Sequence, residues 1–242
     1  MNYFEQSGMT ANDLSALSWE DYFQILNYKI DLTGNNVTPS YFGERIALLK
    51  YIKTECYSQN DSDFQAFHPY VKRLIAGTND TLFNREFDLN LNGKLFGIMA
   101  AAGKFSNRIN EQDMYIGSAL ECIPSEGEVN ETMYKNYLAE FRNAFEKYNY
   151  GGYGLGVTTR LLAMKRPDMF ICINNANYKA IKKIFRSVHL NNYWERVVEP
   201  TQSMNWNKKP ENINSMCEQE LLVFECRAAM LDTLIYNEKS GV

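Results

Sequence analysis

Residues 150–156 read Tyr150-Gly151-Gly152-Tyr153-Gly154-Leu155-Gly156, and four of these seven positions are glycine. Glycine at this density indicates positive φ angles or a backbone that approaches another group closely. Helical patterns precede and follow the stretch, the second at about 157–164, which predicts a tight turn between two helices. In such a helix–hairpin–helix the N–H groups of the turn and the positive end of the next helix dipole converge on one point. The sequence therefore predicts an anion site, suited to a DNA phosphate.

The segment after this turn is strongly basic, although the whole chain has a net charge of −4. Only one acid, Asp168, lies between Arg160 and Arg186. The seven cations of this segment are Arg160, Lys165, Arg166, Lys179, Lys182, Lys183 and Arg186. Because backbone affinity for DNA comes from lysine and arginine displacing counterions, an acidic body with one basic face suits a protein that touches DNA locally. A solvated helix face is the alternative.

Apolar residues recur at helical spacing through most of the chain, which predicts an all-α fold. One domain is expected over 1–242, and the polar stretch at 124–128 divides it into lobes at 1–125 and 126–242. Thr10 and Ser18 are predicted N-caps, Pro167 a helix end, Phe170–Ile173 an extended run and Asn174 the N-cap of the next helix. Helices are expected at about 11–29, 38–52, 61–75, 95–105, 130–148 and 214–236.

Composition excludes several classes of protein. No basic and apolar leader and no run of about 20 apolar residues is present, which argues against secretion and membrane insertion. Five cysteines at irregular spacing suit reduced thiols, so a cytoplasmic protein is expected. Two histidines, no CxxC pair and no GxxxxGK[ST] loop predict neither a metal nor another cofactor. A monomer without membrane contact is the expectation.

The order of glycine-rich hairpin, helix, proline break, apolar run and N-cap resembles the helix–hairpin–helix DNA glycosylase superfamily. The similarity is greatest to its bacterial branch with an 8-oxoguanine-glycosylase-like fold. It covers residues 130–190 well and 95–236 loosely. The resemblance implies two helical lobes around a central cleft, and hydrolysis of the N-glycosidic bond of a flipped-out modified base in duplex DNA to leave an abasic site.

In that family an ionised aspartate at the start of the helix after the hairpin stabilises the positively charged sugar and helps position water. The residue in this place is Asn174, which carries no charge. Three interpretations stay open: Asn174 is an inactivating substitution, it orients water natively, or a nearby acid such as Asp168 or Glu195 substitutes for it. The hairpin also lacks the family's Leu-Pro-Gly start, which leaves its register open.

Bifunctional members of the family carry a lysine nucleophile at the start of the second helix. Gly154 or Thr158 occupies that place here, so a monofunctional enzyme is expected. Lys147, Lys165 and Lys179 are the remaining candidate amines, each better explained as a phosphate contact or a solvated side chain.

Candidate site residues follow from these assignments. The catalytic candidates are Asn174 and Asp168. The predicted DNA contacts are Gly151, Gly152, Gly154, Gly156, Thr158, Arg160, Lys165, Arg166, Asn175, Asn177 and Lys179. An extruded base is held by stacking and edge hydrogen bonds. Its predicted pocket residues are Tyr150, Tyr153, Asn107, Arg108, Trp194 and Trp206, with 191–210 as a variable loop beside the site.

The excised base is left open between two classes. The bacterial branch includes phage-defence enzymes that remove bulky bases such as glucosylated hydroxymethylcytosine, which implies antiviral defence; repair of oxidised or alkylated bases is the alternative. A non-catalytic DNA-binding module would account for Asn174 as well. A helical domain whose basic face meets an acidic protein is a third possibility.

Overall fold

The computed structural model describes residues 3–31, 103–111, 114–146 and 153–235, and within these ranges it contains helices and no strands. The all-α expectation is thereby confirmed for this part of the chain. The expected helices at 38–52 and 61–75, and most of that at 95–105, lie outside the described residues. The same holds for Tyr150, Gly151 and Gly152, which begin the glycine-rich turn.

The amino-terminal segment forms two helices, as its two predicted N-caps, Thr10 and Ser18, indicate. Thr10 is the predicted N-cap of α2 (Ala11–Ala16), and it forms a capping box with Asp13. Leu17 then leaves the helical conformation, with φ −54° and ψ 136°. The hydroxyl of Ser18 accepts the N–H of Asp21 at 3.1 Å, so a new helix, α3 (Trp19–Asp31), begins directly after it.

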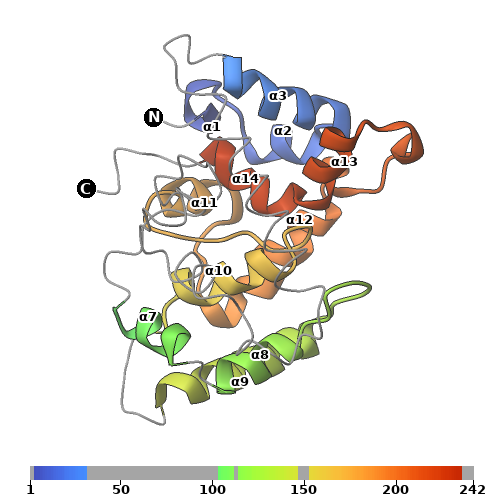
Figure 1. The fold of residues 1–242 in the computed structure, drawn as a ribbon. Helices are drawn as coiled ribbons and strands as arrows, with labels where there is room; N and C mark the ends of the chain where they lie inside the picture. Colours follow the sequence, from blue (N-terminus) through green and yellow to red (C-terminus); the bar gives the residue numbers. More distant parts are fainter. Residues whose placement is uncertain (1–2, 32–102, 112–113, 147–152, 236–242) are drawn as a thin grey trace, which may run out of the picture.

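The amino-terminal helices pack against the carboxy-terminal ones. Helices α1 (Tyr3–Gln6), α2 and α3 lie at one end of the molecule beside α13 (Glu218–Glu225) and α14 (Arg227–Ile235) (Figure 1). The Trp19 indole donates to Glu220 at 2.9 Å, and the Tyr22 hydroxyl donates to the Arg227 carbonyl at 2.9 Å. The amino-terminal and carboxy-terminal helices therefore share one hydrophobic core.

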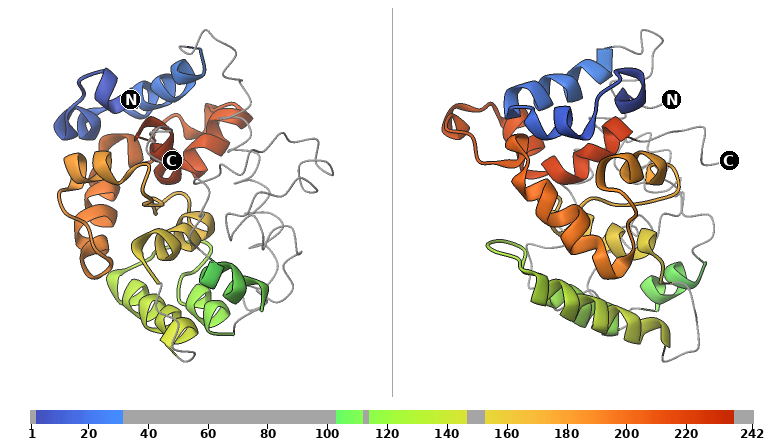
Figure 2. Two further views of the ribbon diagram at one scale, coloured as in Figure 1. Left: turned by 90° about the vertical axis from the view of Figure 1, so that its left-hand side faces the viewer. Right: turned by 180° about the vertical axis from the view of Figure 1, so that it is seen from behind.

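The opposite end of the molecule is a helical hairpin. Helices α8 (Met114–Glu121) and α9 (Glu131–Glu146) lie side by side and are joined by the loop that contains 124–128, while α7 (Gly103–Asn110) lies nearby (Figure 2). Because α8 packs on α9, and α1–α3 pack on the carboxy-terminal helices, the described contacts do not follow the expected division at residue 125.

Helix α10 (Leu155–Lys165) runs through the centre of the molecule between these two ends (Figure 1). Every residue from Val157 to Lys165 is buried, which explains the apolar and small side chains of this helix. The helix ends at Lys165, two residues before Pro167, as the proline predicts. Residues 170–173 then run without helix or strand.

Two expectations for the carboxy-terminal third are wrong. The predicted helix at 214–236 is interrupted at Cys226, which separates α13 from α14. The predicted loop at 191–210 is mainly helical, because its aromatic side chains are buried in the core. Its elements are η3 (Leu190–Asn192), the π-helical turn η4 (Trp194–Val198), α12 (Glu199–Ser203) and η5 (Asn205–Asn207); η6 (Ile213–Ser215) follows.

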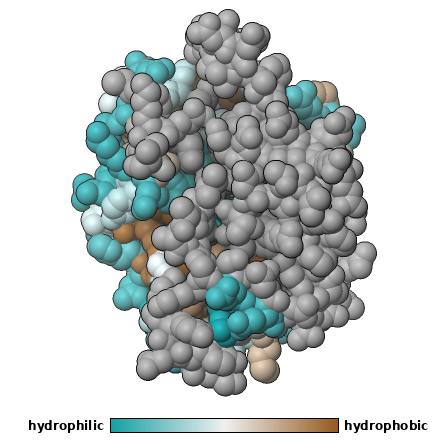
Figure 3. Space-filling view, turned by 60° about the vertical axis from the view of Figure 1, so that its left-hand side comes forward, coloured by the Kyte–Doolittle hydropathy of each residue, from teal (hydrophilic) through white to brown (hydrophobic). Residues whose placement is uncertain are grey.

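Two further expectations concern the described residues: reduced cysteines, and no segment that inserts into a membrane. Cys122, Cys172, Cys217 and Cys226 are free thiols. No described helix has the length and apolar character that crossing a membrane requires. The described surface visible in Figure 3 is mostly hydrophilic, with a smaller group of hydrophobic residues in a recess between hydrophilic ones.

Candidate functional site

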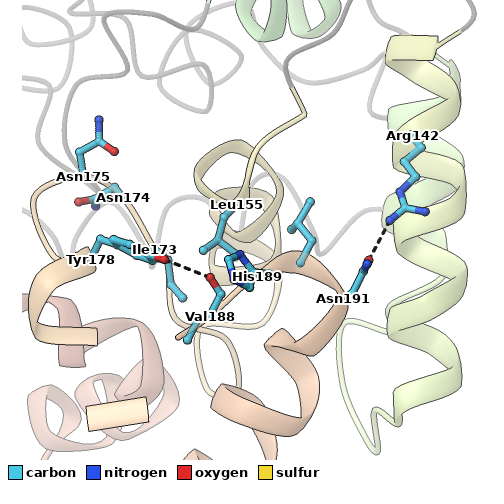
Figure 4. A pocket seen from close by; sticks show the side chains of 10 residues that line it. Arg142, Leu155, Ile173, Asn174, Asn175, Tyr178, Val188, His189 and Asn191 are labelled. Atoms are coloured by element: carbon cyan, nitrogen blue, oxygen red, sulfur yellow. Dashed lines mark hydrogen bonds between the residues drawn. The ribbon is translucent and has the colours of Figure 1, made fainter. Parts of the chain in front are cut away.

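A pocket of about 480 Å³ opens beside the amino-terminal end of α10. Its walls come from α9, the start of α10, the loop before α11 (Tyr178–Phe185) and the segment that leads into η3 (Figure 4). The pocket is rich in amide groups. Its lining residues are Arg142, Leu155, Ile173, Asn174, Asn175, Tyr178, Val188, His189, Leu190 and Asn191.

The extended segment before Asn174 is held from two sides. Buried Thr159 of α10 accepts the N–H of Ile173 at 2.9 Å, and the buried hydroxyl of Tyr193 bonds both the N–H and the carbonyl of Ile171, at 3.0 and 2.8 Å. These bonds fix where the segment leaves the core. Asn174 and Asn175 therefore reach the pocket from a rigid base.

Asn174 forms a capped turn directly before α11, so the predicted capping hydrogen bonds are present, one turn earlier than the first residue of the helix indicates. Its side-chain oxygen accepts the N–H groups of Ala176 at 2.9 Å and Asn177 at 3.1 Å. The N-cap of α11 is Asn177, three residues later. Because the amide is planar, these bonds also fix the direction of the Asn174 NH2 group.

Asn177 organises this turn from the interior, which corrects its prediction as a DNA contact. Its side chain is fully buried. The amide NH2 donates to the Cys172 carbonyl at 2.7 Å and to buried Asp232 at 2.6 Å, while its oxygen accepts the Asn174 N–H at 2.9 Å. Asn177 thus positions Asn174, and because its side chain is fully buried it cannot contact DNA.

Neither acid proposed to replace a catalytic aspartate lines the pocket. Asp168 pairs with Arg166 through two hydrogen bonds of 2.9 and 2.8 Å. Glu195 is exposed on η4, 3.7 Å from Arg196. Among the described lining residues there is no carboxylate, so the interpretation in which a nearby acid substitutes has no support from this geometry.

The described part of the hairpin is accessible. Gly154 is exposed and is the N-cap of α10, without a side-chain cap. Gly156 is partly exposed in the first turn. Leu155, the first residue of α10, lines the pocket, so the positive end of this helix dipole faces the same space as Asn174.

Three of the seven cations of the basic segment are buried, which contradicts their assignment as phosphate contacts. Arg160 is 1% exposed. The Lys165 ammonium donates to the Leu120 carbonyl at 2.6 Å. Arg166 donates to the carbonyls of Pro124 and Gly127 at 3.1 and 3.0 Å, in addition to its pair with Asp168. The reason is that α10 crosses the core, so Lys165 and Arg166, directly after the helix, donate hydrogen bonds to backbone carbonyls of the protein itself.

The other four cations are exposed on or directly after α11. They are Lys179, Lys182, Lys183 and Arg186, spaced so that they follow one face of the helix. Exposed Asn175 and Lys179 remain available as predicted contacts. Thr158 does not, because it is fully buried and its hydroxyl donates to the Gly154 carbonyl at 3.0 Å.

Most predicted base-pocket residues lie elsewhere. Trp206 is fully buried and stacks on Tyr22 with ring centroids 4.2 Å apart, and Trp194 is buried against Tyr134 and Phe170. Their large apolar rings stabilise the core instead. Arg108 is buried and forms an ion pair with Glu111 at 2.8 Å.

Asn107 and Tyr153 are at least partly accessible. Asn107 is exposed on α7 but does not line the pocket. Tyr153 lies beside the pocket, because its ring is 5.9 Å from the Arg142 guanidinium, itself a lining group. Its hydroxyl donates to Glu146 at 2.8 Å, and this bond is the main reason why its pKa is raised.

Three polar lining residues were not predicted, namely Arg142, Tyr178 and His189, whereas Asn191 belongs to the stretch 191–210 that was expected beside the site. They come from three separate segments, and none belongs to a local motif. Only the packing of η3 near α9 brings Arg142 within 3.1 Å of Asn191. Among the described residues, no group of three or more His, Cys, Asp or Glu side chains is arranged to hold a metal ion.

Comparisons with protein-family models, with curated protein sequences and with solved structures find no match to this chain.

Proposed function

We propose that this protein is a monofunctional DNA glycosylase that hydrolyses the N-glycosidic bond of a modified base extruded from duplex DNA. The observation that carries the proposal is the position of Asn174. It lies in a pocket that also receives the first residue of α10, so the residue in the place of the family's catalytic aspartate faces the same space as the helix after the hairpin.

The exposed basic face of α11 supports contact with DNA. Asn174 and Asn175 lie in the turn before this helix, and Lys179 follows within its first turn. A duplex lying along α11 would bring its phosphates to these cations, which supply affinity without reading sequence. The pocket beside them would then receive the extruded nucleotide.

In this proposal Asn174 orients the attacking water. The hydrogen bonds from the N–H groups of Ala176 and Asn177 hold its amide in one orientation. An amide stabilises the developing positive charge on the sugar less than a carboxylate does. An aspartate at this place would accept the same two N–H groups, which favour its ionised form.

Release of free bases, measured by mass spectrometry, tests the proposal. The substrates are phage DNA with glucosylated hydroxymethylcytosine, oxidised DNA, alkylated DNA and unmodified DNA. We expect one modified substrate to lose its base and gain abasic sites. Asn174→Ala should lower this rate about 100-fold or more, the usual contribution of a group that positions a proton-transfer partner.

The matched control is Asn143→Ala, which removes an exposed asparagine on α9 that does not line the pocket. Asn174→Asp should keep or raise the rate of base release. If Asn174→Ala releases bases as fast as the control variant, Asn174 has no part in the chemistry.

A non-catalytic DNA-binding protein is the second candidate, and the pocket's lack of a described carboxylate favours it. It predicts that the natural sequence binds duplex DNA tightly and releases no base from any of the four substrates. Base release by Asn174→Asp alone would identify a glycosylase scaffold that has lost its acid.

A further inference from the structure

Arg142 lies across the pocket from Asn174 and has no role in the glycosylase chemistry assigned to Asn174. It projects from α9 toward Asn191, while Asn174 and Asn175 occupy the opposite wall (Figure 4). Its side chain is partly exposed and belongs to the pocket lining. A guanidinium in this place is accessible to a ligand that enters the pocket.

Two contacts hold the guanidinium in one orientation. One terminal N–H group donates to the side-chain oxygen of Asn191 at 3.1 Å. The ring of Tyr153 lies 5.9 Å from the guanidinium carbon, within the range of a cation–π interaction. A fixed arginine loses less conformational entropy when it binds a ligand than a mobile one does.

The guanidinium has hydrogen-bonding capacity left over. The Nε–H of Arg142 is shielded from solvent and has no hydrogen-bond partner within the described part of the chain. A ligand in the pocket cannot reach this shielded atom, so an acceptor on a bound ligand would meet the terminal N–H groups that Asn191 leaves available. An oxyanion is the natural acceptor, because arginine binds its oxygens through two parallel N–H groups.

The surrounding charges also favour an anion. The described pocket lining contains no carboxylate that would neutralise Arg142. Glu146, one turn further along α9, is not a lining residue and accepts the Tyr153 hydroxyl. His189 and the positive end of the α10 dipole add further groups that suit a negative ligand.

We infer that the pocket binds a phosphate group through Arg142, which Asn191 and Tyr153 hold in place. The phosphate is either a free or monoester phosphate or the diester of a DNA nucleotide. Assigning it to DNA rests on the proposed function, whereas the anion site itself does not. Arg142 would then anchor the backbone of the nucleotide whose sugar faces Asn174.

The test measures binding by the full chain at constant ionic strength, set with chloride. The three probes are inorganic phosphate, a nucleoside 5′-monophosphate and a short duplex with a stable abasic-site analogue. Arg142→Gln removes the charge and keeps a planar amide, and Arg142→Lys keeps the charge without the planar fork. The control is Lys135→Gln, a cation on the same helix that is 64% exposed and pairs with Glu131.

We expect Arg142→Gln to weaken binding of at least one probe about tenfold or more, the range of a charge-assisted hydrogen bond. Arg142→Lys should lie between this variant and the wild type, and Lys135→Gln should match the wild type. Asn191→Ala should weaken the same probe by less. An effect on all three probes identifies a general phosphate site, and an effect on the duplex alone identifies a DNA phosphate.

The inference is overturned if Arg142→Gln and Arg142→Lys, both with wild-type unfolding midpoints, bind every probe as the wild type does. It is also overturned if the wild type binds none of them. Arg142-dependent phosphate binding without base release from any modified DNA would preserve the anion site and remove the glycosylase proposal. The two failures are therefore distinguishable.

Discussion

Helices α10 and α11 differ in how they use the same kind of residue. Both belong to one basic segment, yet Arg160 and Lys165 of α10 are buried in the core, while Lys179 and Lys182 of α11 are exposed to solvent. Helix α10 crosses the centre of the molecule, whereas α11 lies at its surface with one apolar face inward. A run of cations in a sequence therefore does not predict one basic surface, because the fold buries some of these side chains and exposes others.

The largest effect on stability is expected for a buried cation, Arg166, directly after α10. Arg166→Met removes the bidentate pair with Asp168 and leaves the carbonyls of Pro124 and Gly127 without their donor. The free energy of unfolding should fall by about 3 kcal/mol, because a partly buried ion pair is broken and two carbonyls lose their donor. Urea unfolding measures this change. Unaltered stability would mean that Arg166 contributes nothing through these hydrogen bonds.

Asn177→Ala tests whether the buried N-cap of α11 stabilises the fold. The substitution removes hydrogen bonds to Cys172 and Asp232 and the acceptor for the Asn174 N–H. We expect a loss of about 2 kcal/mol of stability. Since Asn174 loses its support, base release should fall as well, even at temperatures where the protein stays folded. Asn143→Ala serves as the matched control in both measurements.

Substitution of the exposed cations on and after α11 should alter DNA binding without altering stability. The double variant Lys182→Gln and Arg186→Gln should bind duplex DNA more weakly. It should also lower the slope of log affinity against log salt by about 0.9 for each phosphate that the protein no longer neutralises. Fluorescence anisotropy across a chloride series measures both quantities. A slope equal to that of Lys135→Gln would show that this face of α11 does not meet DNA.

The smallest effect is expected for Lys183, which is exposed but forms an ion pair with Glu5. Its ammonium lies 2.8 Å from Glu5, and this hydrogen bond is the main reason why the pKa of Glu5 is lowered. The stability from the pair is present above the ordinary carboxyl pKa and is lost as the pH falls through the lowered value. Glu5→Gln should change stability by less than about 1 kcal/mol and raise DNA affinity slightly.

The contrary result for this pair would be a decrease in DNA affinity in Glu5→Gln. It would mean that the ion pair orders Lys183 for DNA instead of competing with it. Acid titration of the wild type and of Glu5→Gln, followed by thermal unfolding, isolates the contribution of the pair. The two curves should converge as the pH falls below the lowered pKa.

Local rules predicted the parts of this chain that depend on neighbouring residues. Thr10 caps α2, Pro167 follows the end of α10, and residues 170–173 run without helix or strand, because capping and the missing proline N–H act within a few residues. The helix expected at 130–148 is α9 at Glu131–Glu146, because its apolar residues recur at helical spacing and form its buried face. The sequence by itself determined these elements.

Only the tertiary structure decided which side chains meet. Arg142 and Asn191 are far apart in the chain and belong to no motif, yet they form one wall of the pocket. Trp206 was placed beside a site and instead stacks on Tyr22 in the core. Periodicity indicates which face of a helix is buried, but the pairing of side chains from distant segments leaves no periodic or local signal in a single sequence.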